Sequence, residues 1–163
     1  MAAPYLLLPF THGIAMDVLE HAVLLAKSRR ATLVPLALVS IPRSGGVRLE
    51  HVQQSKDFLE AVQHISARYD VPVERFEVFT GDVVESINLV AEEVKCEAIL
   101  IFVCEGDGIL LQTSEIKHLM EQATRNFYVI RLPSKGNKRL ALALPRWLAN
   151  WLPGKRGHLS VPG

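Results

Sequence analysis

The sequence has only two cysteines, no long hydrophobic run and, from residue 134 onwards, no acidic residue. Two cysteines are too few for a disulfide framework, and Cys96 and Cys104 flank one expected strand, which disfavours a bridge between them. We interpret both as free thiols in a reducing compartment, and neither has the neighbours of a nucleophile. No apolar run reaches the ~18–20 residues that a membrane-spanning helix needs, and the N-terminus lacks the features of a signal peptide. The expected location is cytoplasmic.

The charge is distributed unevenly, although the chain as a whole carries a formal net charge of only +1. Residues 134–163 hold six basic residues, whereas residues 1–133 hold twelve basic and seventeen acidic ones, a net charge of −5. Because a basic segment beside an acidic body often marks an interaction segment, we expect two parts. They are an α/β domain over residues 1–133 and a basic C-terminal extension over residues 134–163.

Strand and helix patterns alternate along the first part. Continuous apolar runs or strict alternation predict strands at 5–10, 31–41, 73–80, 97–103 and 127–132, and helical periodicity predicts helices at about 14–29, 48–69, 82–94 and from 113 onwards. Pro35 predicts an irregularity or a free edge within the second strand. Asp82 with Glu85 three residues later predicts a helix cap.

This βαβαβαβαβ order favours a parallel sheet with helices on both faces. In such sheets a ligand lies beyond the carboxyl ends of the strands, where the strand order reverses. The residues to search are therefore 10–13, 40–46 and 104–114.

Several stretches resemble the universal stress protein family over roughly residues 4–132. They are Leu-Leu-Leu-Pro-Phe at 6–10, Val-Pro-Val-Glu at 71–74, Phe-Thr-Gly-Asp-Val-Val-Glu-Ser-Ile at 79–87, and Ala-Glu-Glu at 91–93 before Glu-Ala-Ile-Leu-Ile-Phe-Val at 97–103. The resemblance implies a five-stranded sheet in the order 3-2-1-4-5, similar to adenine-nucleotide alpha-hydrolases. It also implies a homodimer paired through the last strand, Phe127–Leu132.

Nucleotide-binding members of that family carry three spaced glycines and a Ser or Thr after the fourth strand, because glycines and a helix N-terminus admit phosphates. Here the loop is shorter, its third glycine is missing, Asp107 adds negative charge, and a threonine stands where the family has an aspartate after the first strand. We therefore expect that ATP is not held in the usual way. The residues that remain candidates for nucleotide or anion binding are Thr11, Gly106, Gly108, Thr113 and Ser114.

Each candidate also has a plainer interpretation. The two glycines form either an anion nest or a tight turn, and Ser114 either binds phosphate or caps a helix. His12 and Arg43 either face a ligand in the cleft or lie on surface loops. The histidine spacing does not suit a metal site, so no metal is expected.

The C-terminal extension contains both tryptophans of the chain. Between Pro145 and Pro153 an apolar stripe recurs at helical spacing, and two cations follow it; the candidate contact residues are Leu144, Trp147, Leu148, Trp151, Leu152, Lys155 and Arg156. Three interpretations stay open: docking on its own domain or dimer mate, lying in an anionic membrane interface, or docking on a partner protein. Nucleic acid is not an expected partner.

The sequence thus predicts a dimeric regulatory or interaction module without enzymatic activity, cytoplasmic or peripheral to a membrane. The alternative is a universal stress protein that binds ATP or AMP, with weak or no hydrolysis.

Overall fold

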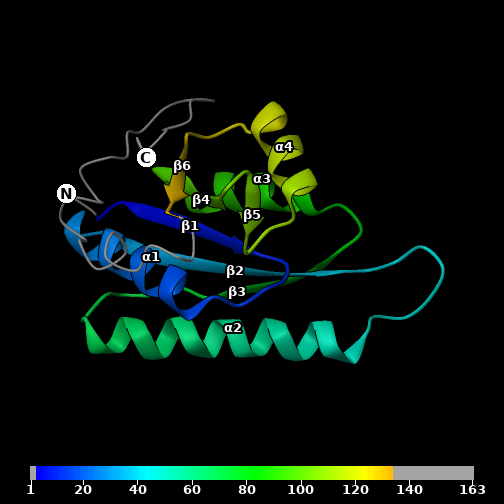
Figure 1. The fold of residues 1–163 in the computed structure, drawn as a ribbon, viewed down its shortest axis with the longest axis horizontal. Helices are drawn as coiled ribbons and strands as arrows, with labels where there is room; N and C mark the ends of the chain where they lie inside the picture. Colours follow the sequence, from blue (N-terminus) through cyan, green and yellow to red (C-terminus); the bar gives the residue numbers. More distant parts are fainter. Residues whose placement is uncertain (1–2, 134–163) are drawn as a thin grey trace.

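The computed structural model describes residues 3–133, and Figure 1 shows how strands and helices alternate along them. The strands are β1 (Tyr5–Phe10), β2 (Thr32–Ser40), β3 (Phe76–Thr80), β4 (Ala98–Cys104), β5 (Asp107–Ile109) and β6 (Phe127–Leu132). The helices are α1 (Met16–Ser28), α2 (Leu49–Arg68), α3 (Val83–Val94) and α4 (Thr113–Gln122). Among these helices, none is long and apolar enough to cross a bilayer. The expected contact residues of the extension, Leu144 to Arg156, lie outside the described residues.

Five parallel strands form the sheet in the order β3-β2-β1-β4-β6, which is the 3-2-1-4-5 order expected when the short β5 is left out of the numbering. The predicted α/β fold class is therefore confirmed. β5 was not predicted: it pairs antiparallel with β4, at Phe102–Ile109 and Cys104–Asp107, within a stretch that the sequence indicated as a loop.

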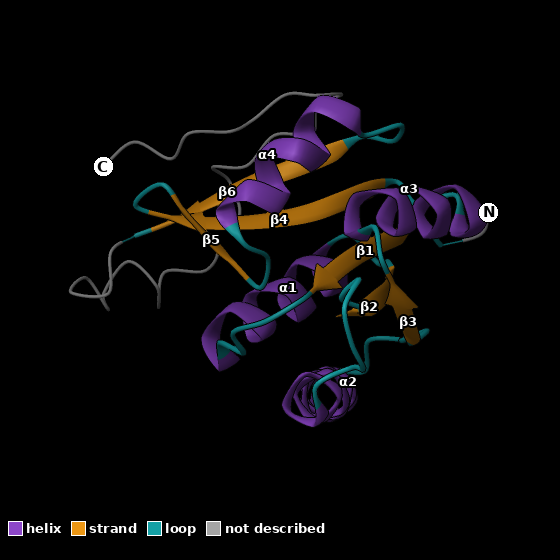
Figure 2. Cartoon of the chain, turned by 90° about the vertical axis from the view of Figure 1, so that its right-hand side faces the viewer, coloured by secondary structure: helices purple, strands orange, loops and turns teal. Residues whose placement is uncertain are grey.

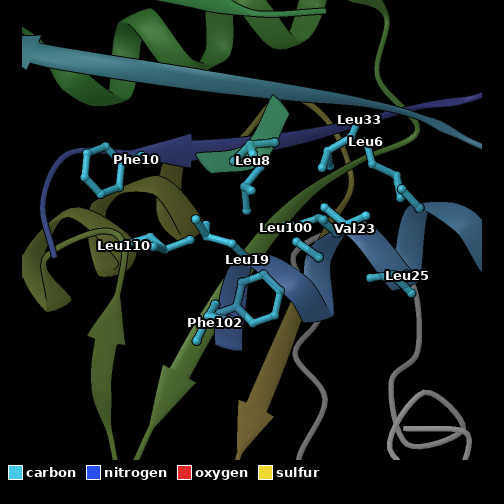
Figure 3. Close-up of a cluster of buried hydrophobic side chains, with 14 of the residues drawn as sticks. Leu6, Leu8, Phe10, Leu19, Val23, Leu25, Leu33, Leu100, Phe102 and Leu110 are labelled. Atoms are coloured by element: carbon cyan, nitrogen blue, oxygen red, sulfur yellow. The ribbon is translucent and has the colours of Figure 1, made fainter. Parts of the chain in front are cut away.

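Each face of the sheet has its own core. The α1-side core joins α1 and α2 to alternate strand residues, among them Leu6, Leu8, Phe10, Leu33, Leu100 and Phe102. The α3-side core joins α3 and α4 to the intervening ones, among them Leu7, Val34, Leu36, Ile99 and Ile101. Figure 2 shows the two helix layers on opposite faces of the sheet, and Figure 3 shows the α1-side core around Leu8, Leu19 and Leu100.

Pro35 lies in a central strand, β2, and is buried there, so it does not mark a sheet edge. Pairing with the β3 side is nevertheless interrupted at this point. Leu33 forms an isolated bridge with Val73, and the regular ladder begins only at Leu36 opposite Phe76. Because proline has no N–H to donate, it fits this interruption, and the irregularity predicted from the sequence is confirmed.

The cap predicted for α3 is also present. Asp82 has an extended backbone and its Oδ1 accepts a hydrogen bond from the N–H of Glu85 at 3.0 Å. In a full capping box the N–H of Asp82 would donate to the Glu85 side chain. Here it donates instead to Oγ1 of Thr80 at 2.9 Å. Thr80, which ends β3, thus fixes the entry into α3.

Neither cysteine forms a disulfide within residues 3–133, as the sequence predicts, and the two thiols differ in environment. Cys96 is 1% exposed, and burial raises the pKa of its thiol to about 11, while Arg125 opposes the rise. Cys104 is only half-buried at the end of β4.

Alkylation is expected to distinguish them. At pH 8 a thiol of pKa about 11 is thiolate in only about one molecule in a thousand, so iodoacetamide should label Cys104 and leave Cys96 unlabelled until the chain is denatured. Mass spectrometry of the digested protein reads out each site. Equal labelling of both thiols in the folded chain would contradict the burial of Cys96.

Candidate functional site

The candidate site lies where β1 and β4 separate at the carboxyl ends of the strands. The two strands pair only at Leu6–Ala98 and Leu7–Ile99. Beyond that point, the edge of β4 that faces β1 pairs with β5, and the opposite edge pairs with β6 along its whole length. The strand order reverses between β1 and β4, and sheets of this class bind their ligands at such an opening. Here the β4–β5 hairpin lines the opening.

The hairpin turn explains one of the two predicted glycines. Glu105 and Gly106 have φ values of 53° and 84°, and Cys104 pairs with Asp107 on either side of them. Two consecutive residues with positive φ make the tight turn that matches the twist of antiparallel strands, and glycine adopts this conformation without steric strain. Gly106 therefore serves the turn.

The second glycine, Gly108, allows close packing. Its N–H donates to Oγ1 of Thr113 at 2.9 Å. A Cβ at this position would lie 2.4 Å from the backbone oxygen of Leu111 and 2.7 Å from Cδ1 of Ile116. The structure therefore brings the candidate residues Gly108 and Thr113 together. The hydrogen bond between them occupies the Gly108 amide, which is then not available to a phosphate.

Two leucines after β5 fill the opening between β1 and β4. Leu110 belongs to the α1-side core and Leu111 to the α3-side core, and each is 2% exposed. Adjacent residues thus insert into cores on opposite faces of the sheet, which places this segment in the opening itself; Figure 3 shows Leu110 near Phe10 and Leu19. Leu110 has a φ of 73°, a left-handed conformation that costs a residue with a side chain about 1–2 kcal/mol.

The backbone of Leu110 also holds the end of β1. Its carbonyl oxygen accepts hydrogen bonds from the N–H groups of Thr11 at 2.8 Å and of His12 at 3.2 Å. Two amides that follow β1 beside this opening are therefore engaged by the chain itself. Favourable bonding of these amides helps to offset the strained φ of Leu110.

The N-terminus of α4 is closed by its own side chains. Gln112 is the N-cap residue and forms a capping box with Glu115, whose Oε1 accepts from the N–H of Gln112 at 2.8 Å. The same Oε1 accepts from the Thr11 hydroxyl at 2.7 Å. A carboxylate beside the first turn compensates the positive end of the helix dipole, where a phosphate would otherwise bind.

The predicted binding residues therefore meet only in part. Thr11, Gly108 and Thr113 lie around the opening, with Thr11 bonded to α4 through Glu115. Ser114 is exposed in the first turn of α4 and is not the N-cap; the prediction that it caps the helix is wrong, because Gln112 and Glu115 form that cap. His12 is exposed, and its Nδ1 lies 3.2 Å from Oγ1 of Thr11.

The sequence reasoning missed Leu110, Leu111 and the Gln112–Glu115 pair. Glu115 at the third helical position was a usable signal, since a capping box places Glu or Gln there. Glutamine is not among the residues preferred at the N-cap, so Gln112 gave no signal of its own. The leucines carried no such signal, because a Leu-Leu pair in a loop has no periodicity. Residues 3–133 contain no group of three His, Cys, Asp or Glu side chains that could hold a metal ion.

Comparisons with known proteins bear on the family and the fold of this chain. The model of the universal stress protein family matches residues 11–102, more than half of the chain. The comparison with curated protein sequences gives no match.

Solved structures share the fold at low identity. A universal stress protein from Archaeoglobus fulgidus is 17% identical with a TM-score of 0.62, over 79% of this chain and 98% of that one. The universal stress protein from the same organism in complex with dAMP is 17% identical with a TM-score of 0.60, over 78% and 97%. A family protein from Burkholderia pseudomallei is 19% identical with a TM-score of 0.59, over 80% and 96%. With the family model covering most of the domain and the sheet order matching, this chain belongs to the universal stress protein family.

Proposed function

We propose that this universal stress protein is a regulatory or interaction module, without enzymatic activity, whose cleft does not hold a nucleotide in the family's usual way. One observation carries the proposal: Leu110 and Leu111 occupy the opening between β1 and β4, and the Leu110 carbonyl takes the Thr11 and His12 amides. A ligand at this position would have to displace two buried leucines and two backbone hydrogen bonds.

Electrostatics support the same proposal. The first turn of α4 faces its own Glu115 carboxylate, and the hairpin adds the exposed Glu105 and Asp107 close to the end of β4. Negative groups at a phosphate position repel the ligand, and they remove the advantage that a helix N-terminus gives to an anion.

The second candidate function is ATP or AMP binding with weak or no hydrolysis. It is favoured by the dAMP complex of the Archaeoglobus fulgidus protein, which shares this fold at 17% identity. In this chain the contacts would come from Thr11, Gly106, Gly108, Thr113 and Ser114. Nucleotide binding therefore requires the β4–β5 hairpin, Leu110 and Leu111 to move out of the opening, whereas the interaction function does not.

Calorimetry with ATP and with AMP on the full chain tests the two candidates. We expect no binding tighter than millimolar, because the amides and the helix N-terminus are already engaged. The matched variants are Ser114→Asp, which adds a carboxylate to the exposed first turn of α4, and Gln63→Glu, which adds one at an exposed position of α2. Submillimolar binding that Ser114→Asp abolishes and Gln63→Glu retains would establish the nucleotide-binding function instead.

The assembly that we propose is a homodimer through β6. This strand pairs with β4 on one edge, and on its other edge it has no strand partner among residues 3–133. Free edges of this kind invite pairing with another chain. Light scattering on the full chain measures the mass that decides between monomer and dimer.

The C-terminal extension is the proposed contact element. Its sequence combines the stripe Leu144, Trp147, Leu148, Trp151 and Leu152 with six cations and no acid. Such a segment suits an apolar groove with an acidic rim, or an anionic membrane surface. The protein would then be cytoplasmic, and peripheral to a membrane where lipid is the partner.

A further inference from the structure

The outward face of α3 carries an acidic stripe, which we define as Glu85, Leu89, Glu92 and Glu93. At 100° per residue these four positions fall within an arc of about 100° on one side of the helix. The three glutamates are exposed, and Leu89 between them is 64% exposed, one of the few large apolar side chains left in solvent. The helix therefore presents an apolar centre within a negative rim.

This charge pattern stabilises the helix only in part. Glu85 lies in the first turn, where the helix dipole favours negative charge, whereas Glu92 and Glu93 lie in the last turn, where it disfavours it, and α3 contains no basic residue. Glu92 is compensated by Arg125 at 3.8 Å and by the Thr124 hydroxyl, which donates to it at 3.1 Å. Glu93 has no ion-pair partner among residues 3–133, and an uncompensated departure from local stability rules is expected at a functional surface.

The complementary chemistry is present in the same chain. Residues 134–163 carry six cations and no acid, and their stripe from Leu144 to Leu152 offers apolar side chains at helical spacing. An apolar centre with a negative rim matches an apolar stripe with flanking cations. The described domain, at −5, attracts a +6 segment as a whole, and α3 is where that charge surrounds an exposed leucine.

The length of the chain permits this contact. β6 ends at Leu132, and α3 begins just after β3, so both ends lie at the carboxyl edge of the sheet. Helix α4 packs beside α3, joined by the Asn88 amide donating to the Gln122 carbonyl at 3.0 Å; Figure 2 shows the two helices on one face of the sheet. Crossing α4 to reach α3 requires about 20 Å at helix spacings of 8–10 Å. Residues 134–143 span up to about 33 Å when extended.

We propose that residues 144–156 of the same molecule dock on the acidic stripe of α3. This inference rests on the proposed function, because it assigns the resting position of the contact element. Docking covers Leu89 with the Leu and Trp side chains of the segment and places its cations beside Glu85 and Glu93. An external acidic surface then competes with α3 for the segment, and salt weakens the docked state because exposed charges are screened.

Tryptophan emission tests the docking, because both indoles belong to the extension. Acrylamide quenching is measured on the full chain, with the variants Leu89→Gln and Glu85→Gln/Glu93→Gln. The matched controls are Leu49→Gln, which alters an 85% exposed leucine on α2, and Asp57→Asn/Glu60→Gln, which removes two exposed carboxylates from α2 on the opposite face of the sheet. Circular dichroism verifies that every variant is folded.

We expect emission of the native chain at low salt to be blue-shifted and weakly quenched, and independent of protein concentration. Removing two charge contacts in Glu85→Gln/Glu93→Gln should lower the ratio of docked to free segment about fivefold and raise quenching. Leu89→Gln should also raise quenching, because it removes the apolar centre of the stripe, while the controls match the native chain. Added salt should raise quenching in the native chain and in Leu89→Gln, and less in the charge variant.

Three results would overturn the inference: quenching that the α3 variants do not change, equal effects of the controls, or quenching that changes on dilution, which indicates docking between molecules. None of them bears on nucleotide binding. Conversely, tight ATP binding in calorimetry would overturn the proposed function without altering the tryptophan readout.

Discussion

Replacing Gly108 by Ala is expected to lower the free energy of unfolding by about 3 kcal/mol. The added Cβ would lie 2.4 Å from the Leu111 oxygen and 2.7 Å from Cδ1 of Ile116, and the first of these is a backbone atom that cannot rotate away. The strain exceeds the gain of about 0.4–1 kcal/mol that Gly-to-Ala changes produce through the unfolded chain. Urea denaturation followed by circular dichroism measures the difference.

The matched control for this prediction is Gly46→Ala. Gly46 lies in the loop before α2, and a Cβ there meets no atom within 4 Å. We expect a change within about 0.5 kcal/mol. If the two variants unfold at the same urea concentration, the hairpin does not pack against α4 as described, and the cleft would be open to ligands.

Replacing Phe58 by Ala is expected to lower the free energy of unfolding by about 3–5 kcal/mol. Phe58, on α2, is fully buried and stacks on Phe10 with ring centroids 4.3 Å apart and planes 6° from parallel. Phe10 is the last residue of β1 and directly precedes Thr11. The stacked pair therefore holds the strand end from which the Thr11 and His12 amides reach Leu110.

The control for Phe58 is Phe79→Ala. Phe79 lies near the end of β3, the edge strand of the sheet, and its side chain is 46% exposed. Its removal therefore leaves no cavity of comparable size. We expect a loss of about 1 kcal/mol or less. Thermal unfolding of both variants beside the native chain provides the comparison, and similar losses would mean that Phe58 is not fully packed.

The order of elements could be predicted because each helix and long strand repeats a single hydrophobic period. The stripe Val84, Ile87 and Ala91 predicted α3, and the apolar run from Ala98 predicted β4; both are buried as expected. Boundaries differ by one or two residues for most elements. The third strand is the exception, since Val73 contributes only an isolated bridge and the regular ladder begins at Phe76.

The candidate site was predicted less well than the fold. The position of the opening followed from the strand order, and Thr11, Gly108 and Thr113 indeed lie around it. The occupants of the opening were not foreseen. β5 has three residues, too few for any periodicity, and it forms only because the turn at Glu105 and Gly106 returns the chain along β4.

The sequence by itself determined the family, the alternation of strands and helices, and the division of charge between an acidic domain and a basic extension. Local periodicity and composition carry that information, because they act within short windows of the chain. Only the tertiary structure decided what fills the cleft. Leu110 and Leu111 are adjacent in sequence but enter different cores. Similarly, Thr11 and Glu115 share one hydrogen bond across 104 positions of sequence. Contacts of this kind depend on where the sheet brings distant segments together, and no local pattern encodes them.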